Sequence, residues 1–356
     1  MRLVTFRVAT PVGPAVRLGA LLDNRTDHRI VDLTAGFAAY LGNETDEPTP
    51  RELAQLRVPP DMTGWLRASH AGFKAAETTL AYVRANPAAK GLDGETLVYA
   101  RSDVALMAPL PRPHSFRDFS IYEEHMSRQH LDPTNPGAAK NNKKPAWYRA
   151  PPYYKGSCSS IAGPEDPIPW PYYTKRLDME LELGIVVGKT GRNLTVEQAK
   201  DFIAGYTIIV DSSCRDGYER EPFGPTKRKD FHTAVGPWLV TPDELDVETL
   251  DCSVAIDGEV CFAGNTSAPH SFTPAQLVAY ASDNETLYPG DLLGTGTVSL
   301  ACSMDHHHWV KVGQTMTFIV DGLGKMSLKV VQADAPVRHV DGMESLVAPP
   351  AAKPAA

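Results

Sequence analysis

Residues 176–189, RLDMELELGIVVGK, form the segment that most narrows what this chain can fold into. The segment has the pattern of a strand, and alternation along a strand sends Glu180 and Glu182 to the same face. Apolar residues surround both acids, and a buried pair of like charges is costly unless a cation neutralises it. The segment therefore predicts a metal site, with an exposed edge face that carries two acids as the alternative.

The composition excludes several kinds of partner. The chain has 356 residues, of which 42% are hydrophobic and 22% charged, as in an ordinary soluble globular protein. A net charge of −8 argues against nucleic acid or an anionic membrane as the main partner. Because we find neither an apolar span of about 18 residues nor a signal peptide, we expect a cytoplasmic protein. The five cysteines lack C-x-x-C spacing, which predicts reduced thiols that serve mostly in packing.

The chain is expected to divide into three parts. Residues 1–105 carry short apolar strands, turn signals and a helical pattern over residues 64–85, which predicts a small N-terminal α+β domain. A proline-rich linker leads into residues 106–345, the expected catalytic domain. Residues 346–356, LVAPPAAKPAA, are expected to be a disordered tail.

A candidate base precedes a long irregular stretch. In RDFSIYEEHMSRQH, Asp118 lies seven residues before His125, so the two would lie on one face if the stretch is helical. A solvated histidine is the alternative. Residues 131–171 are rich in Pro, Gly, Asn, Lys and Tyr, and loops of this length are usually lids or disordered segments. We therefore predict that residues 118–154 form a mobile lid over the metal.

Local signals predict further elements. Asp211 ends a buried strand beside an arginine, a position where many scaffolds carry catalytic groups. Thr195 begins a helix with a capping box, and Thr273 caps a second helix. Asp-Gly pairs at residues 257–258 and 321–322 predict hairpin turns. The GTGT segment has too few glycines for a phosphate loop, which favours a close approach of backbone to a ligand.

Four elements, taken in order, resemble the fumarylacetoacetate hydrolase superfamily over roughly residues 109–331. They are DFSIYEEH, LDMELELGIVVGK, VDSSCRD with KRKDFHTAVGPWLVTP, and GTGTVS with the closing DGLGKMSLKV. The resemblance implies a mostly β, α+β fold. It consists of a mixed β-roll or sandwich catalytic domain with a small N-terminal domain, usually in a homodimer.

The resemblance also implies a metal centre. In the family, four acids hold one divalent cation, and the matching positions here are Asp118, Glu180, Glu182 and Asp211. An all-oxygen ligand set suits Mg²⁺ best, with Mn²⁺ or Ca²⁺ as alternatives, rather than zinc.

The remaining candidate residues surround that cation. His125 matches the family's water-activating base, and Asp305 stands near the position of the acid that orients it. Lys229 and Arg215 match cationic side chains near the metal. The candidates for substrate contact are Tyr154, in a loop resembling Y-x-G-x-x-S-S; Tyr218, at the place of a family glutamine; and Thr297 of GTGT.

We therefore expect a metal-dependent hydrolase that cleaves a C–C bond in a small oxo acid. The substrate would be an acylpyruvate or 1,3-diketo acid like fumarylacetoacetate or fumarylpyruvate, from aromatic or organic-acid catabolism. Decarboxylation, enol–keto isomerisation or dehydration of a 2-oxo acid would use the same scaffold. A non-catalytic cation-binding protein is an alternative of another class. A zinc hydrolase using His306, His307 and His308 is a third, which is disfavoured because adjacent residues diverge on any regular element.

Overall fold

The computed structural model describes residues 1–23, 28–128, 147–216 and 225–334. It is mostly β, with a few helices, which confirms the expected α+β class. Three predicted features lie outside the described residues: the central residues 129–146 of the lid, the candidate Tyr218 and the tail over residues 346–356. None of the helices in the described parts of the chain combines the length and hydrophobicity that crossing a membrane requires.

The larger sheet runs through the whole molecule. Its strands follow the order β4-β3-β2-β1-β12-β11-β10-β15-β6-β7, with β5 on β1 and β8 on β12. The strands from the N-terminal part are β1 (Arg2–Val8), β2 (Ala15–Leu21), β3 (Ile30–Asp32), β4 (Val98–Tyr99) and β5 (Ala105–Leu106). The others are β6 (Phe116–Phe119), β7 (Tyr153–Lys155), β8 (Ile161–Ala162), β10 (Leu177–Val187), β11 (Ile203–Cys214), β12 (Thr233–Val240) and β15 (Leu292–Cys302).

The N-terminal part joins this sheet through one strand pair. Arg2 of β1 is opposite Val240 of β12, and the Met1 ammonium group lies 2.9 Å from the Glu244 carboxylate. Four helices pack beside the N-terminal strands: α1 (Leu33–Glu44), α2 (Pro50–Arg57), α3 (Met62–Arg67) and α4 (Ser69–Ala85). The expectation of a single helix over residues 64–85 is wrong. The helix is interrupted between α3 and α4, where Ser69 has a φ of 52°.

A smaller sheet forms the other layer of the catalytic part. Its order is β14-β13-β16-β17-β9, built from β9 (Ile168–Trp170), β13 (Asp251–Ile256), β14 (Glu259–Asn265), β16 (Thr315–Val320) and β17 (Gly324–Gln332). The predicted hairpin turns at Asp257-Gly258 and Asp321-Gly322 connect β13 to β14 and β16 to β17. Apolar side chains from both sheets meet in one core, and a second core lies under the N-terminal helices.

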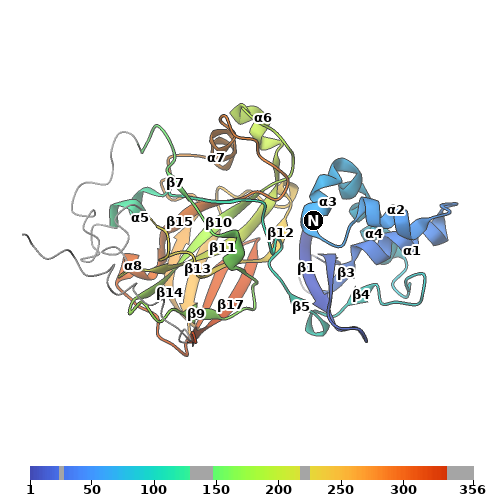
Figure 1. Cartoon of the computed structure of the whole chain (residues 1–356), viewed down its shortest axis with the longest axis horizontal. Helices are drawn as coiled ribbons and strands as arrows, with labels where there is room; N and C mark the ends of the chain where they lie inside the picture. Colours follow the sequence, from blue (N-terminus) through green and yellow to red (C-terminus); the bar gives the residue numbers. More distant parts are fainter. Residues whose placement is uncertain (24–27, 129–146, 217–224, 335–356) are drawn as a thin grey trace, which may run out of the picture.

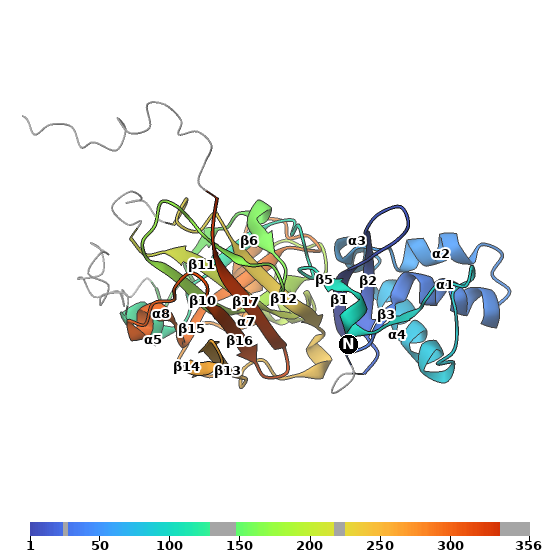
Figure 2. The ribbon, with the colours of Figure 1, turned by 90° about the horizontal axis from the view of Figure 1, so that it is seen from below.

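In the described residues of the catalytic part, four short α-helices accompany the strands. They are α5 (Glu123–Arg128), α6 (Val196–Lys200), α7 (Pro274–Ala281) and α8 (Ser303–His306). Capping boxes at Thr195 and Thr273 begin α6 and α7, as predicted. Figures 1 and 2 both place α5 and α8 at the end of the molecule opposite the N-terminal helices. Side chains from these two helices enter the candidate site.

Candidate active site and metal centre

Strand register gathers the predicted acids. β10 lies between β11 and β15, and Glu180 on β10 is directly opposite Asp211 on β11. Glu182 is opposite Thr297 on β15, and Gly294 of β15 is opposite Asp118 on β6. Asp118 therefore lies on a strand and His125 on a separate helix, so the condition for a shared helix face, a helical stretch from 118 to 125, is not met. Strand pairing, rather than helical spacing, brings the two to one site.

Three of the four acids form a close group. Ligand oxygens of Asp118, Glu182 and Asp211 all lie within 4.8 Å of one another, and all three side chains are buried. A Cβ atom at Gly294 would lie 2.6 Å from both Asp118 Oδ1 and Glu182 Oε2. The glycine therefore leaves the space into which these two carboxylates extend.

The electrostatics of this group fit a hard divalent cation. Burial, together with the charge of Asp211, raises the pKa of Asp118 to about 8. Burial and the neighbouring Asp118 raise the pKa of Glu182 well above its usual value. Asp118 Oδ1 is buried and accepts no hydrogen bond from the described residues. Three buried carboxylates are costly to ionise together unless a cation balances their charge. Their oxygen atoms are the ligands that Mg²⁺, Mn²⁺ or Ca²⁺ prefers.

Glu180 stands beside this group in a different environment. Its carboxylate forms ion pairs with Arg215 and Lys229, and the Lys229 ammonium also binds Asp211. Burial alone would raise the pKa of Glu180, but Arg215 and Lys229 hold it well below its usual value. The structure therefore brings all four predicted ligands to one place, and two of them, Glu180 and Asp211, are bound to Lys229.

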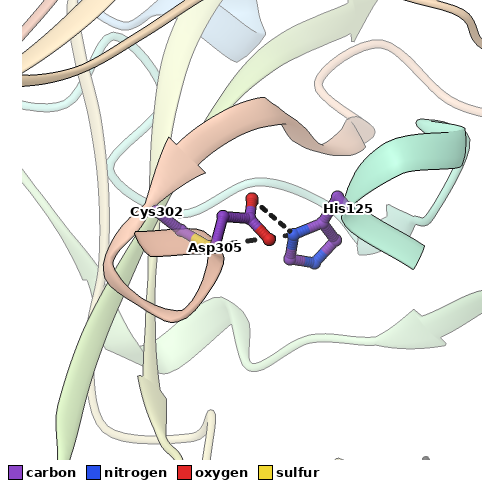
Figure 3. Close-up of side chains that lie close together, drawn as sticks. All are labelled: His125, Cys302 and Asp305. Atoms are coloured by element: carbon purple, nitrogen blue, oxygen red, sulfur yellow. Dashed lines mark hydrogen bonds and ion pairs between the residues drawn. The ribbon is translucent and has the colours of Figure 1, made fainter. Parts of the chain in front are cut away.

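His125 lies between two carboxylates. Its Nδ1 is 3.2 Å from Asp305 Oδ2, and its Nε2 is 3.4 Å from Glu180 Oε1. Burial lowers the pKa of His125, but Asp305 and Glu180 raise it to a net value of about 9. Figure 3 shows the imidazole of α5 pointing at the Asp305 carboxylate of α8. The structure thus brings together the predicted base and its predicted partner.

Sequence reasoning missed Asp178. Its Oδ2 accepts a hydrogen bond from Arg215 Nε at 2.8 Å, and its Oδ1 accepts one from the backbone N–H of Ser303 at 2.8 Å. Asp178 therefore holds the arginine that pairs with Glu180 and also the start of α8. The signal was present, because Asp178, Glu180 and Glu182 alternate along one strand and must share a face.

A cavity of about 260 Å³ opens beside these groups. His125, Lys229, Tyr154 and Thr297 contribute to its lining. Burial and Asp211 raise the pKa of Tyr154 well above its usual value, so its hydroxyl remains protonated and donates to Asp211 Oδ2 at 2.9 Å. A larger cavity of about 630 Å³ lies near Trp238, but the candidate site residues are absent from its described lining. The candidate catalytic residues therefore favour the smaller cavity as the substrate site.

The histidine run does not form a metal site in the described structure. His306 Nε2 lies 2.8 Å from the Leu300 carbonyl oxygen, and its ring stacks on Phe262 at 4.6 Å. His307 and His308 are exposed at the end of α8. Among the described residues, the groups of metal-ligating atoms within 4.8 Å of one another include none of these histidines.

Comparison with known proteins bears on the same residues. The sequence profile of the fumarylacetoacetate (FAA) hydrolase C-terminal domain matches residues 115–331. A protein of Burkholderia ambifaria, provisionally named a hydrolase, is 40% identical over 173 residues. That alignment covers 47% of this chain and 61% of the relative, so the match spans less than two thirds of the relative.

Solved structures share the fold. A maleylpyruvate hydrolase of Sphingobium sp. SYK-6, in complex with manganese(II) and pyruvate, has a TM-score of 0.63 at 24% identity, over 94% of this chain and 100% of that one. A 5-carboxymethyl-2-hydroxymuconate delta-isomerase of Mycobacterium smegmatis has a TM-score of 0.61 at 22% identity, over 93% and 100%. At such identities the likeness shows the fold alone.

Proposed function

The chain belongs to the fumarylacetoacetate hydrolase family, and on that premise we propose that it is a metal-dependent hydrolase of acylpyruvates or related 1,3-diketo acids. The observation that carries the proposal is the position of His125. It is buried between Asp305 and Glu180, beside three carboxylates that need a cation. A cation-binding protein without catalysis would have no use for a base held in this way. The maleylpyruvate hydrolase with bound manganese and pyruvate supports the reaction class.

The cation-binding residues would be Asp118, Glu182 and Asp211, with Glu180 as the fourth ligand. Mg²⁺ is the proposed ion, and Mn²⁺ or Ca²⁺ would meet the same all-oxygen set. When bound, the ion would polarise the carbonyl group that water attacks. Arg215 keeps Glu180 ionised, and Tyr154 orients Asp211 through its hydroxyl.

The proton is moved by the chain's own residues. Because its pKa is raised to about 9, His125 must first lose the proton on Nε2, the ring nitrogen on the side of Glu180. It would then take a proton from water at that nitrogen, while Nδ1–H donates to Asp305. The Asp305 carboxylate fixes this tautomer and stabilises the imidazolium that forms. His125 can then return the proton to the carbon that leaves when the C–C bond breaks. Lys229 offsets the negative charge of Glu180 and Asp211 during these steps.

Isomerisation of an unsaturated oxo acid is the second candidate, because the same base can move a proton between carbon atoms. The structural likeness to the delta-isomerase favours it over decarboxylation and dehydration. Hydrolysis and isomerisation differ in one respect that can be measured. Hydrolysis yields two acids, whereas isomerisation leaves the mass of the substrate unchanged.

The test is a turnover screen of purified protein. Chelator-treated protein, with Mg²⁺, Mn²⁺ or Ca²⁺ added back, is given acylpyruvates, fumarylpyruvate, fumarylacetoacetate or oxaloacetate, and the products are identified by mass. We expect metal-dependent release of pyruvate from at least one acylpyruvate, and no release by His125→Gln. Turnover at the same rate with and without chelator, or none of any substrate, would contradict the proposal.

We also propose that the protein forms a homodimer and that its substrate is a small-molecule oxo acid. A dimer would have about twice the 38.7 kDa mass of one chain. Light scattering coupled to size exclusion measures this mass directly, and a value of one chain mass would contradict the proposal.

A further inference from the structure

A second group of ligating side chains lies on the far side of the His125 ring from Glu180. Cys302, the last residue of β15, places its Sγ 3.7 Å from His125 Nδ1, and Asp305 Oδ2 lies 3.2 Å from the same nitrogen. Their ligand atoms all lie within 4.8 Å of one another. All three side chains are buried, and Figure 3 shows them converging from α5, β15 and α8.

We propose that His125, Cys302 and Asp305 form a second cation site, selective for thiophilic divalent ions such as Zn²⁺. The distances carry this proposal. In a tetrahedral site, the ion lies about 2.1 Å from nitrogen and oxygen and about 2.3 Å from sulfur. Two ligand atoms of such a site are then roughly 3.4 Å apart for N···O and roughly 3.6 Å apart for N···S. The observed distances from His125 Nδ1, 3.2 Å to Asp305 Oδ2 and 3.7 Å to Cys302 Sγ, agree with both values. An ion could therefore bind with little movement of the backbone.

The ligand types set the selectivity. A thiolate, an imidazole and a carboxylate suit Zn²⁺, whereas Mg²⁺ and Ca²⁺ prefer oxygen ligands. The two charges of the ion would neutralise the Cys302 thiolate and the Asp305 carboxylate. Binding displaces the thiol proton of Cys302 and the proton on His125 Nδ1 into solvent, so the exchange balances without any other reactant. The acid cluster of Asp118, Glu182 and Asp211 and this site would thus take different ions.

The shared histidine couples the two sites. An ion on Nδ1 removes the hydrogen bond from His125 to Asp305, and with it the group that orients the proposed base. Zn²⁺ should therefore inhibit turnover even when Mg²⁺ is saturating. This consequence rests on the proposed function, whereas ion binding itself does not.

Binding is tested with Co²⁺, because cobalt bound to a thiolate absorbs strongly in the near ultraviolet and cobalt bound to oxygen does not. Full-length protein saturated with Mg²⁺ is titrated with Co²⁺. We expect this absorption in the wild type, its loss on addition of Zn²⁺, and its absence in Cys302→Ser and Cys302→Ala. Cys252→Ser, which removes another buried cysteine on β13, should leave it unchanged. Absence of the band in the wild type, or its persistence in both folded Cys302 variants, would overturn the proposal.

Inhibition provides the second measurement. At saturating Mg²⁺ the Zn²⁺ concentration that halves turnover should rise at least about 10-fold in Cys302→Ala, because one of three ligands is lost. Equal inhibition of wild type and variant would place zinc at the carboxylates and overturn the inhibitory role. A protein that shows the cobalt–thiolate band but turns over no oxo acid would keep this site and reject the proposed function. The two proposals can therefore fail separately.

Discussion

Lys229 determines how the buried acids are charged when no cation is bound. Burial would lower its pKa, but Asp211 and Glu180 raise it well above the usual value, so the side chain stays an ammonium ion. That charge offsets Glu180 and Asp211, with which it pairs. Within the described residues, neither Asp118 nor Glu182 forms an ion pair with a cationic side chain, and their raised pKa values indicate that they retain protons instead. A cation must therefore displace protons chiefly from these two residues.

Glu182→Gln tests this assignment. The amide keeps the shape of the side chain but removes one charged ligand, so we expect the affinity for Mn²⁺ to fall on the order of 100-fold or more, with the fold intact. Isothermal titration calorimetry with Mn²⁺ gives the affinity. Glu197→Gln, at an exposed position on α6, is the control and should bind as the wild type does. Undiminished affinity in Glu182→Gln would remove this residue from the site.

Asp305→Asn tests the orientation of His125. An amide can accept the Nδ1–H hydrogen bond but also permits the wrong tautomer, so kcat should fall by up to ~10⁴. The affinity of the Asp118, Glu182 and Asp211 group for Mg²⁺ should change little. Steady-state kinetics on the substrate found in the screen provides the value. Near-normal kcat in this variant, beside an inactive His125→Ala, would mean that the histidine works with another partner.

At the scale of elements, β15 controls how closely the carboxylates approach. Gly294 lies in a strand without positive φ, so its role is space rather than backbone conformation. We expect Gly294→Ala to push Asp118 and Glu182 apart, because its methyl group would lie 2.6 Å from an oxygen of each. Metal affinity should fall at least about 10-fold while circular dichroism stays that of the wild type. Ala301→Gly, at a buried position of the same strand, is a control for β15 itself, and equal affinity in all three proteins would contradict this role.

The elements that local sequence signals define were the ones that could be predicted. The Asp-Gly hairpin turns and the capping boxes at Thr195 and Thr273 depend on residues a few positions apart, and the structure contains all of them. Helix α1 was missed because it follows β3 without a turn signal and its Ala- and Gly-rich sequence has little amphipathic pattern. The pairing of Glu180 with Asp211, and of β1 with β12, depends on register between distant strands, which no local pattern specifies.

In the candidate site, too, features set by a local pattern could be predicted, and features set by distant contacts could not. Alternation along β10 correctly placed Glu180 and Glu182 on one face, since this needs only a strand. His125 and Asp305 are 180 residues apart, and only the family resemblance connected them before the structure.

For the whole molecule, the acid cluster links stability to pH and to metal. Asp118 has a pKa of about 8 in the folded chain against 3.8 when unfolded, so the folded state binds more protons between these values. Stability without metal should therefore fall as pH rises through that window. A divalent cation replaces the protons, and its stabilisation should grow over the same range.

Thermal unfolding with and without chelator measures this effect. We expect the Tm difference between Mg²⁺-loaded and chelated protein to be larger at about pH 9 than at about pH 6, since fewer protons then compete for the site. Glu182→Gln should reduce the difference at both values. A Tm difference that shrinks as pH rises would contradict the proton competition.

The pairing of β1 with β12 also imposes a delay during synthesis of the chain, because the two strands lie far apart in the sequence. Arg2 meets Val240, so more than two hundred residues must be synthesised between one half of this strand pair and the other. At about 5–20 residues per second, the ribosome takes on the order of ten to fifty seconds to deliver the partner strand. During that interval the backbone groups of β1 on the side of β12 lack their final partner. The nascent chain must therefore keep the apolar edge of β1 from pairing elsewhere, and a chaperone bound to β1 during translation would prevent such pairing.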